Sequence, residues 1–285
     1  MFDKINRDKV KFERRIIFGY VVTGLAFILY MPLAVAIGPA VFFIIVIPFL
    51  GGGLYAAHNY KQIKNLSIAF KTKYLPEEMQ KIFSDGKYYH NRGFTEEEII
   101  SSGLLHKQDR FASEDLIEGS FAGVNFKCCD ITQKDVRSNG KSTTVVTVFQ
   151  GRFYEFDFPK AFKYNLLLLQ PYNYRPFSGF TKVKTENVQF NSEIKIYAKN
   201  EHEAFYILTP NFMEKIMYMD KKYEDKIVFS FKDNRLYIAI DSRVDHFDLK
   251  AFKQVNASIF EEYRNELNDI LDFIRILQLD LTLFK

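Results

Sequence analysis

The longest hydrophobic run in the chain spans residues 16–60 and contains no Asp, Glu, Lys or Arg. A bilayer core takes about 20 apolar residues per helix, so this run is long enough for two membrane spans. We predict spans at 16–36 and 40–57, joined by a short turn at 37–39, where Gly and Pro stand together. The pattern therefore predicts a two-helix transmembrane hairpin at the N-terminal end, with the turn at its tip.

A cleaved signal peptide is the alternative interpretation of the first span. Basic residues precede it, and Ala34-Val35-Ala36 has the small side chains of a cleavage site. However, the chain continues from there directly into a second apolar run, unlike a mature secreted N-terminus. Cleavage would also leave the second span as an anchor, so we favour the hairpin.

Basic residues flank the hairpin on both sides and are absent from its tip. Six Lys or Arg residues lie in the first 15 positions, and Lys61, Lys64, Lys71 and Lys73 follow the second span. Because loops rich in Lys and Arg stay in the cytoplasm, we expect both termini to be cytoplasmic. Within the second span, we expect the run of three glycines at 51–53 to allow close helix–helix approach or a kink.

The next segment, residues 61–92, has apolar residues at steps of three and four and predicts a helical connector. We expect Pro76 to start a fresh helical turn. Thr95 and Glu98 have the spacing of a capping box and predict a helix start.

Between residues 113 and 241 the hydrophobic period is mostly two. The alternation predicts strands at 124–128, 145–158, 165–169 and 193–199, and a hairpin of 227–231 with 236–240. We expect a bulge at Gly151. One helical insert begins near Asn200 and Thr209-Pro210. Strands grouped in this way favour an α+β fold with a largely antiparallel sheet.

We therefore divide the chain into a basic cytoplasmic N-terminus (1–15), the hairpin (16–60), the connector (61–92) and a cytoplasmic α+β domain (93–285). A C-terminal helix is predicted over 258–282. Its apolar residues follow alternating steps of three and four, which is the spacing of a heptad seam. The seam consists of Phe260, Tyr263, Leu267, Ile270, Ile274, Leu277, Leu281 and Phe284. It is either a contact with a second chain or one helix packed on its own sheet, and further apolar residues beside it favour the second.

Charge and cysteine content exclude two classes of protein. Residues 61–285 hold 33 Lys+Arg against 32 Asp+Glu, so the part outside the hairpin is nearly neutral and lacks the footprint of a nucleic-acid groove. Two cysteines exclude a disulfide-dense secreted module. Cys128 and Cys129 are neighbours on a predicted strand and point to opposite faces, so we interpret them as packing residues.

No motif in the sequence assigns a catalytic, cofactor-binding or metal-binding residue. Glu201, His202 and Glu203 do not share one helix face, and no second His lies four positions away. The loop with Tyr172, Tyr174 and Arg175 combines aromatic rings with a cation. It is either a contact for headgroups or a partner, or a packed loop.

Several stretches carry a family resemblance. They are GFTEEEIISSGLL (93–105), SEDLIEG (113–119), FAGVNF (121–126), VFQGRFYEFDF (148–158), NEHEAFYILTPNFMEKI (200–216) and IVFSFKDNRLYIAI (227–240). Their order and spacing resemble a bacterial family of membrane-anchored proteins known as domain of unknown function 3137. The resemblance implies a place in the bacterial cytoplasmic (inner) membrane and a LemA-type membrane protein as a partner, and it brings no catalytic residues.

Our leading hypothesis is a membrane-anchored, cytoplasm-facing interaction or scaffolding protein without catalysis. Its expected partners are the lipid bilayer, another protein or a second copy of the chain, and not nucleic acid. The alternatives are an enzyme at the membrane surface, or a protein that binds lipid or another small molecule. For these alternatives, Glu201, His202 and the loop 172–177 are the first places to examine.

Overall fold

The structure is a computed structural model, and it describes all residues except 1, 159–164, 171–173, 225, 245 and 280–285. It contains two compact units, each made of two stretches of chain. The first unit consists of Met1–Tyr74 and Phe247–Tyr263, and the second of Leu75–His246 and Arg264–Lys285.

Two long helices dominate the first unit: α1 (Phe2–Ile37) and α2 (Val41–Gln80), of which the residues after Tyr74 belong to the second unit. They are joined at Gly38, whose φ of +94° is a conformation that glycine adopts without strain. The predicted fresh start at Pro76 is wrong, because α2 passes through that residue without interruption.

The two helices approach each other closely at a pair of glycines. A Cβ atom on Gly19 would lie 2.6 Å from the carbonyl oxygen of Gly52, and one on Gly52 would lie 2.7 Å from the carbonyl oxygen of Gly19. The Thr23 hydroxyl also donates to the carbonyl oxygen of Phe49 at 3.2 Å. Gly51 has open space around it. Of the glycine run, Gly52 thus provides the expected close helix–helix approach.

The outward faces of both helices carry large apolar side chains. Phe27 is 73 % exposed, Val35 is 86 % exposed and Phe43 is 74 % exposed. By length and composition, α1 and α2 are each able to cross a membrane. Side chains of this kind are costly in water and favourable in lipid.

A segment from the C-terminal part of the chain, residues 247–257, packs on α1; we call it the strap. Asn6 exchanges two hydrogen bonds with the backbone of Val255, at 2.7 and 2.9 Å. The buried ammonium of Lys9 pairs with Glu13 and donates to the carbonyl oxygen of Lys253 at 2.8 Å. The start of α1 is thus fixed by polar contacts to the strap.

The strap is also bound to α2. The Ser67 hydroxyl donates to Asp248 at 3.0 Å and accepts from the backbone N–H of Leu249 at 2.8 Å. Lys71, buried to 1 % exposure, forms an ion pair with Asp248 at 2.6 Å. Residues of α1 that precede the apolar run 16–60 and residues of α2 that follow it therefore bind the same strap.

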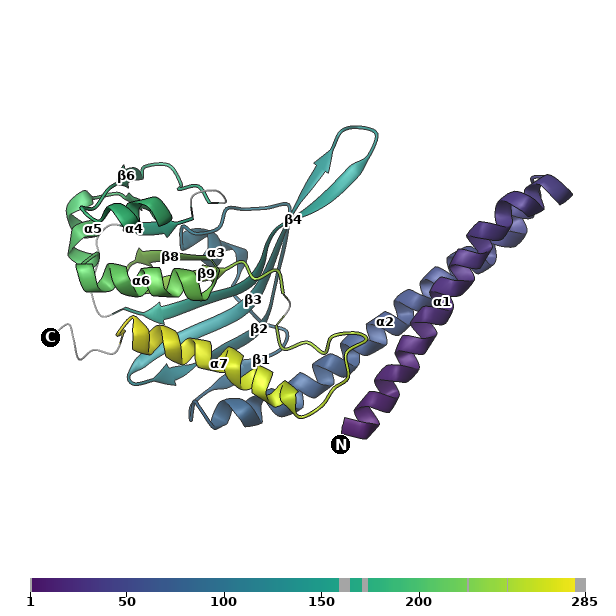
Figure 1. The fold of residues 1–285 in the computed structure, drawn as a ribbon, viewed down its shortest axis with the longest axis horizontal. Coiled ribbons are helices and arrows are strands. Elements are labelled where there is room, and N and C mark those ends of the chain that lie inside the picture. Colours follow the sequence, from purple (N-terminus) through teal and green to yellow (C-terminus); the bar gives the residue numbers. More distant parts are fainter. Residues whose placement is uncertain (1, 159–164, 171–173, 225, 245, 280–285) are drawn as a thin grey trace. The chain divides into compact units, whose positions relative to one another are not determined.

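The second unit is built on a nine-stranded antiparallel sheet in the order β1-β2-β3-β4-β9-β8-β5-β7-β6 (Figure 1). The strands are β1 (Lys87–Tyr89), β2 (Arg110–Phe121), β3 (Val124–Ser138), β4 (Thr143–Asp157), β5 (Leu166–Leu169), β6 (Thr181–Val183), β7 (Lys195–Ala198), β8 (Ile227–Lys232) and β9 (Arg235–Ile240). The remaining helices are α3 (Glu96–Ser101), α4 (Val188–Glu193), α5 (Glu201–Ile207), α6 (Pro210–Lys222) and α7 (Ser258–Ile276). The predicted α+β class, with two apolar N-terminal helices and a C-terminal helix, is confirmed.

Both faces of the sheet are covered. On one face, Phe94 and Ile99 at α3 pack in a cluster with Cys129 and Phe153. On the other, the ring of Phe273 in α7 lies against the rings of Tyr154 and Phe156. Figure 1 shows α6 and α7 on this second face.

Local signals place several elements as predicted. Thr95 and Glu98 form both hydrogen bonds of the capping box, and Thr209 caps α6 through the N–H of Phe212. Asp233 and Asn234 have φ of +48° and +60°, as a tight hairpin turn between β8 and β9 requires.

The predicted bulge at Gly151 is wrong. Gly151 pairs regularly with Ile131, and the register shift lies between Gln133 and Lys134, which leaves Val148 as the extra residue on β4. Glycine at 151 serves another purpose: a Cβ there would lie 1.9 Å from the carbonyl oxygen of Ile240, so the strands β4 and β9 approach too closely for any side chain.

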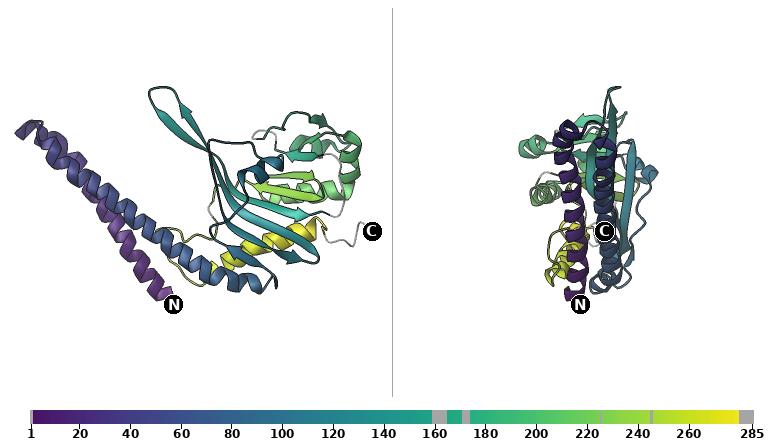
Figure 2. Two further views of the ribbon diagram at one scale, coloured as in Figure 1. Left: turned by 180° about the vertical axis from the view of Figure 1, so that it is seen from behind. Right: turned by 90° about the vertical axis from the view of Figure 1, so that its right-hand side faces the viewer.

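The hairpin formed by β3 and β4 extends beyond the neighbouring strands. β2 pairs with β3 only as far as Lys134, and β9 pairs with β4 only from Arg152 onward. We call residues 135–147 the arm. Figures 1 and 2 show it projecting from the sheet.

Candidate functional site

A groove of about 660 Å³ lies at the base of the arm in the second unit. Four segments far apart in the sequence form it: the arm and its base, the loop after α3, the loop at 174–176 and the turn after β9. Its lining consists of Leu104, Leu105, His106, Gln108, Gln133, Arg137, Val146, Val148, Phe149, Tyr174, Arg175, Pro176, Asp241 and Arg243. The volume is in the range of sites that hold small molecules or peptide side chains.

Arg243 positions one wall of the groove. Its φ of +57° turns the chain after β9, and its N–H donates to the carbonyl oxygen of Gln150 at 2.8 Å. Its guanidinium donates to the carbonyl oxygens of Thr147 at 2.8 Å and Val148 at 3.1 Å, and pairs with Asp241 at 2.8 Å. Arg243 thus covers part of the β4 edge where β9 ends.

The opposite wall joins two loops. Nε2 of His106 donates to the carbonyl oxygen of Arg175 at 2.9 Å, and its ring stacks on Phe177 with the centroids 4.0 Å apart. The buried amide of Gln133 donates to the carbonyl oxygen of His106 at 3.0 Å. These contacts hold the backbone of Arg175 while its side chain stays exposed.

The rim of the groove is positively charged. Arg137 pairs with Asp135 at 2.8 Å and is 67 % exposed, and its hydrogen bond lowers the pKa of Asp135. No carboxylate among the described residues pairs with the guanidinium of Arg175. Asp241 is the one carboxylate in the described lining, and burial raises its pKa.

A buried polar network lies on the other face of the sheet. The guanidinium of Arg152, 1 % exposed, donates to Asp130 at 3.0 Å and lies 3.6 Å from Glu266 of α7. The backbone N–H of His246 donates to the second oxygen of Asp130 at 2.8 Å. Burial raises the pKa of Asp130, and the positive charge of Arg152 opposes that rise.

His246 also links two side chains in a row. Its Nε2 lies 2.9 Å from the Ser242 hydroxyl, and its Nδ1 lies 2.8 Å from Glu266. Hydroxyl, imidazole and carboxylate follow one another in the order used by serine hydrolases, but Nδ1 of His246 forms no hydrogen bond among the described residues. Ser242 does not line the groove, and the same contacts also fasten the turn after β9 to α7.

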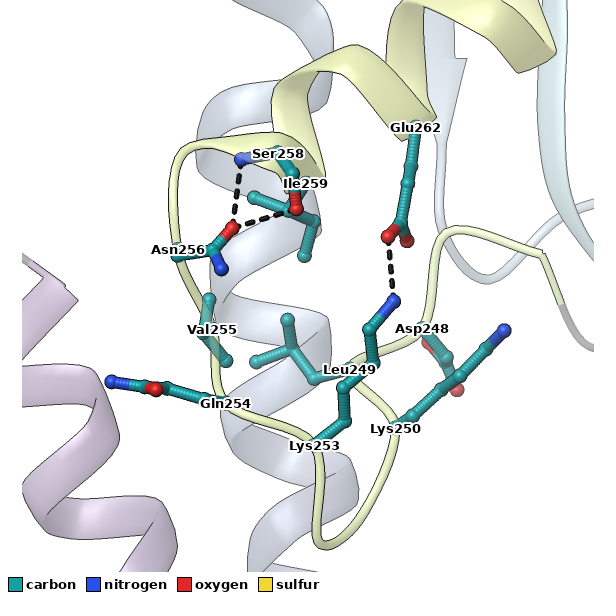
Figure 3. A pocket seen from close by; sticks show the side chains of 10 residues that line it. All are labelled: Asp248, Leu249, Lys250, Lys253, Gln254, Val255, Asn256, Ser258, Ile259 and Glu262. Carbon is teal, nitrogen blue, oxygen red and sulfur yellow. Dashed lines mark hydrogen bonds and ion pairs between the residues drawn. The ribbon is translucent and has the colours of Figure 1, made fainter.

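A much smaller cavity lies within the first unit, along the strap and the start of α7 (Figure 3). Its volume is about 20 Å³, which leaves room for about one water molecule. The Lys253–Glu262 ion pair at 2.7 Å and hydrogen bonds between Ser258 and Asn256 lie at its wall. It is too small for an organic ligand.

The structure separates the interaction residues that the sequence singled out. Tyr263, Leu267, Ile270, Ile274 and Leu277 of the heptad seam are buried within the chain. Burial favours the interpretation of the seam as core packing, since a surface for a second chain would leave these side chains exposed. Phe260 is half-buried, and Leu281 and Phe284 lie outside the described residues.

The aromatic loop contributes to the groove. Tyr174 is half-buried in its lining and Arg175 is exposed at its rim, while Tyr172 lies outside the described residues. Burial raises the pKa of Tyr174, so its hydroxyl stays protonated. Glu201 and His202 are exposed at the start of α5, away from the groove lining.

Sequence reasoning missed most of the groove. Arg137, Arg243 and His106 are single residues in unrelated local patterns, and no spacing connects them. Only the strand order brings them to one place.

The two cysteines are both buried, and burial raises the pKa of each thiol to about 12. Cys129 contacts the Ser113 hydroxyl at 3.2 Å. Within the described part of the chain, no cluster of three or more His, Cys, Asp or Glu side chains has the arrangement of a metal site.

Together these features define a class: an α+β protein with two long apolar helices and an antiparallel sheet that carries an open, cationic groove. Residues 147–279 match the model of a family described as "Protein of unknown function (DUF3137)". The match confirms the domain of unknown function that the sequence resemblance indicated, and half of the residues that line the groove lie within the matched range.

One solved structure is similar, the crystal structure of the mycobacterial trehalose monomycolate transport factor A, TtfA. The TM-score is 0.38 and the identity 11 %, over 72 % of this chain and 97 % of that chain. A similarity of this size supports no inference about function. No curated protein matches the chain.

Proposed function

We propose that this protein is a membrane-anchored interaction protein. α1 and α2 form a hairpin in the bacterial cytoplasmic membrane, and the second unit works in the cytoplasm as a binding module. The observation that carries the proposal is the combination of two charge-free helical stretches with outward apolar faces and an open groove with a cationic rim.

Contacts in the first unit support the interpretation that α1 and α2 form one hairpin, with both of its ends on the same side of the membrane. Asn6 and Lys9 precede the first apolar run, and Ser67 and Lys71 follow the second. All four bind the polar strap. A polar strap does not enter lipid, so both ends of the hairpin lie on one side of the membrane.

The charge pattern supports a cytoplasmic location for that side. An open hollow at the start of α1 is lined by Arg7, Lys11, Arg14 and Arg15. Such a cluster beside a span attracts anionic headgroups of the cytoplasmic leaflet and agrees with the positive-inside rule.

Membrane extraction of the full chain tests the anchor. We expect the protein to stay in the bilayer after washing with alkaline carbonate, which releases peripheral proteins. Replacing Leu25 of α1 and Leu50 of α2 together with Arg, one cation in each span, should release it, because each cation at mid-span costs about 2.5–3.5 kcal/mol. Val188→Arg, at an apolar residue 81 % exposed in the second unit, is the control and should change nothing. Release of the unaltered chain would contradict the proposal.

The row Ser242–His246–Glu266 favours a second candidate, a hydrolase at the membrane surface. His246 would take the Ser242 proton, and the carboxylate of Glu266, 2.8 Å from Nδ1, would stabilise the imidazolium that forms. A fluorophosphonate probe should then label the native chain at Ser242 and fail to label Ser242→Ala. Absence of labelling in the unaltered chain would remove this candidate.

A further inference from the structure

The free edge of β4 is a place where another strand can be added. β9 covers β4 only from Arg152 onward, and Arg243 covers the carbonyl oxygens of Thr147 and Val148. Residues 143–146 therefore keep an edge that no neighbouring strand in the described chain occupies. Unpaired backbone groups at such an edge are a template for an incoming strand.

The sequence of this edge carries none of the charged residues or prolines that usually protect a free edge, and the bulge at Val148 marks its end. Thr143-Thr144-Val145-Val146-Thr147-Val148 contains no charge, Pro or Gly, and consists of residues with high β-propensity. Val145 is 43 % exposed and Val148 is 38 % exposed. A two-stranded hairpin alone is marginally stable in water, so an unprotected arm of this kind is best explained by a partner strand.

The groove beside the edge selects the charge of that partner. Arg137, Arg175 and Arg243 line it against Asp241, the single carboxylate in the described lining. Asp241 is already bound by Arg243 and by the N–H of Gln150, and Arg137 is paired with Asp135 beside the groove. The guanidinium of Arg175 is exposed and without a carboxylate among the described residues. Arginine forks bind carboxylates in two-pronged geometry.

We propose that the groove binds an extended, acidic segment of a partner protein, which pairs with β4 at residues 143–146 and places a carboxylate on Arg175. This inference rests on the proposed interaction function and names the chemistry of the partner. A peptide fits better than a lipid, because an acyl chain gains nothing from a free strand edge and the groove is lined about equally by polar and apolar groups.

The test uses the full chain in nanodiscs and two fluorescent peptides, one alternating Glu with Val and one alternating Lys with Val. We expect the acidic peptide to bind and the basic one not to bind. Arg175→Glu should weaken binding about tenfold or more, and Arg175→Lys, which keeps the charge but not the two-pronged geometry, should weaken it less. Lys182→Glu makes the same change of charge sign on β6, at the far edge of the sheet, and should leave binding unchanged.

Hydrogen exchange gives the readout for strand pairing. The bound acidic peptide should slow amide exchange within residues 143–146, and exchange on β6 should stay the same. Equal binding of both peptides, no binding of either, or binding without protection of β4 would overturn the inference. A further result would also overturn it, namely that Arg175→Glu weakens binding to phosphatidylglycerol vesicles and leaves binding to the acidic peptide unchanged. The groove would then bind lipid headgroups.

The same samples separate this inference from the proposed function. If the chain inserts into nanodiscs but the acidic peptide does not bind, the groove assignment fails and the membrane anchor stands. If the chain does not insert, the anchor itself fails.

Discussion

The ammonium of Lys71 lies 2.6 Å from the carboxylate of Asp248, although the two residues are far apart in the sequence, and Lys71 is almost completely buried. Removing one partner of a buried ion pair weakens the compensation of the charge that stays buried. Asp248→Ala should therefore destabilise the first unit by about 3 kcal/mol, seen as a lower melting temperature of the full chain in detergent.

The matched control for this prediction is the exposed pair Lys253–Glu262 in the same unit, at 2.7 Å. Glu262→Ala removes an ion pair screened by water and should cost about 0–1 kcal/mol. Equal effects of Asp248→Ala and Glu262→Ala would show that the strap does not depend on its contact with Lys71.

A second prediction concerns the glycine contact between α1 and α2. Gly52→Leu should push the helices apart, because a Cβ there would lie 2.7 Å from the carbonyl oxygen of Gly19, and should cost about 1–3 kcal/mol. Gly51→Leu has open space and should have little effect. Crosslinking between cysteines placed on the two helices would measure the change, and identical yields for both variants would contradict the packing.

Asp85 gives a prediction for pH dependence. The hydroxyl and the backbone N–H of Ser120 donate to its carboxylate at 2.7 and 3.0 Å, and these bonds lower its pKa. The ionised carboxylate of Asp85 therefore stabilises the folded state. This contribution is complete above the ordinary aspartate pKa of about 3.9, and it is lost as the pH falls through the lower pKa of the folded state.

Asp85→Asn should therefore be less stable than the unaltered chain at neutral pH, by roughly 1 kcal/mol since the site is exposed. The difference should shrink once the pH falls below the ordinary aspartate value. Urea unfolding of the two proteins across this range measures it. A difference that is constant with pH would mean that the charge of Asp85 contributes nothing.

The cysteines give a fourth prediction. Because both thiols are buried with a pKa of about 12, iodoacetamide should leave the folded chain unmodified at neutral pH and modify Cys128 and Cys129 after unfolding in denaturant. Mass spectrometry of intact protein would count the modifications. Rapid alkylation of the folded chain would contradict the interpretation of both residues as packing residues.

Elements with strong local signals could be predicted from the sequence. The capping residues Thr95 and Glu98, the Thr209-Pro210 helix start and the alternation on β8 and β9 act over a few residues and do not depend on the rest of the fold. The short strands β1 and β6 were missed, because three residues carry no period and form only through pairing with a neighbour.

The groove could not be predicted for the same reason. Its cations stand alone in the sequence, and the register shift at Val148 and the left-handed turn at Arg243 arise from strand pairing. The spacing of the seam at Leu267 and Ile274 was visible, but spacing alone does not show what covers a helix face. The aromatic loop was the one local pattern that pointed to the groove, through Tyr174 and Arg175.

Cysteine labelling in intact cells tests the membrane-anchored account most directly, because the two native thiols are buried. Ile37→Cys places a reactive thiol at the hairpin tip, and Lys182→Cys places one on the second unit. The account predicts that a membrane-impermeant maleimide labels the chain with Ile37→Cys from outside, and labels the chain with Lys182→Cys only after the cells are opened. Labelling of Lys182→Cys in intact cells, or of Ile37→Cys only in opened cells, would contradict it.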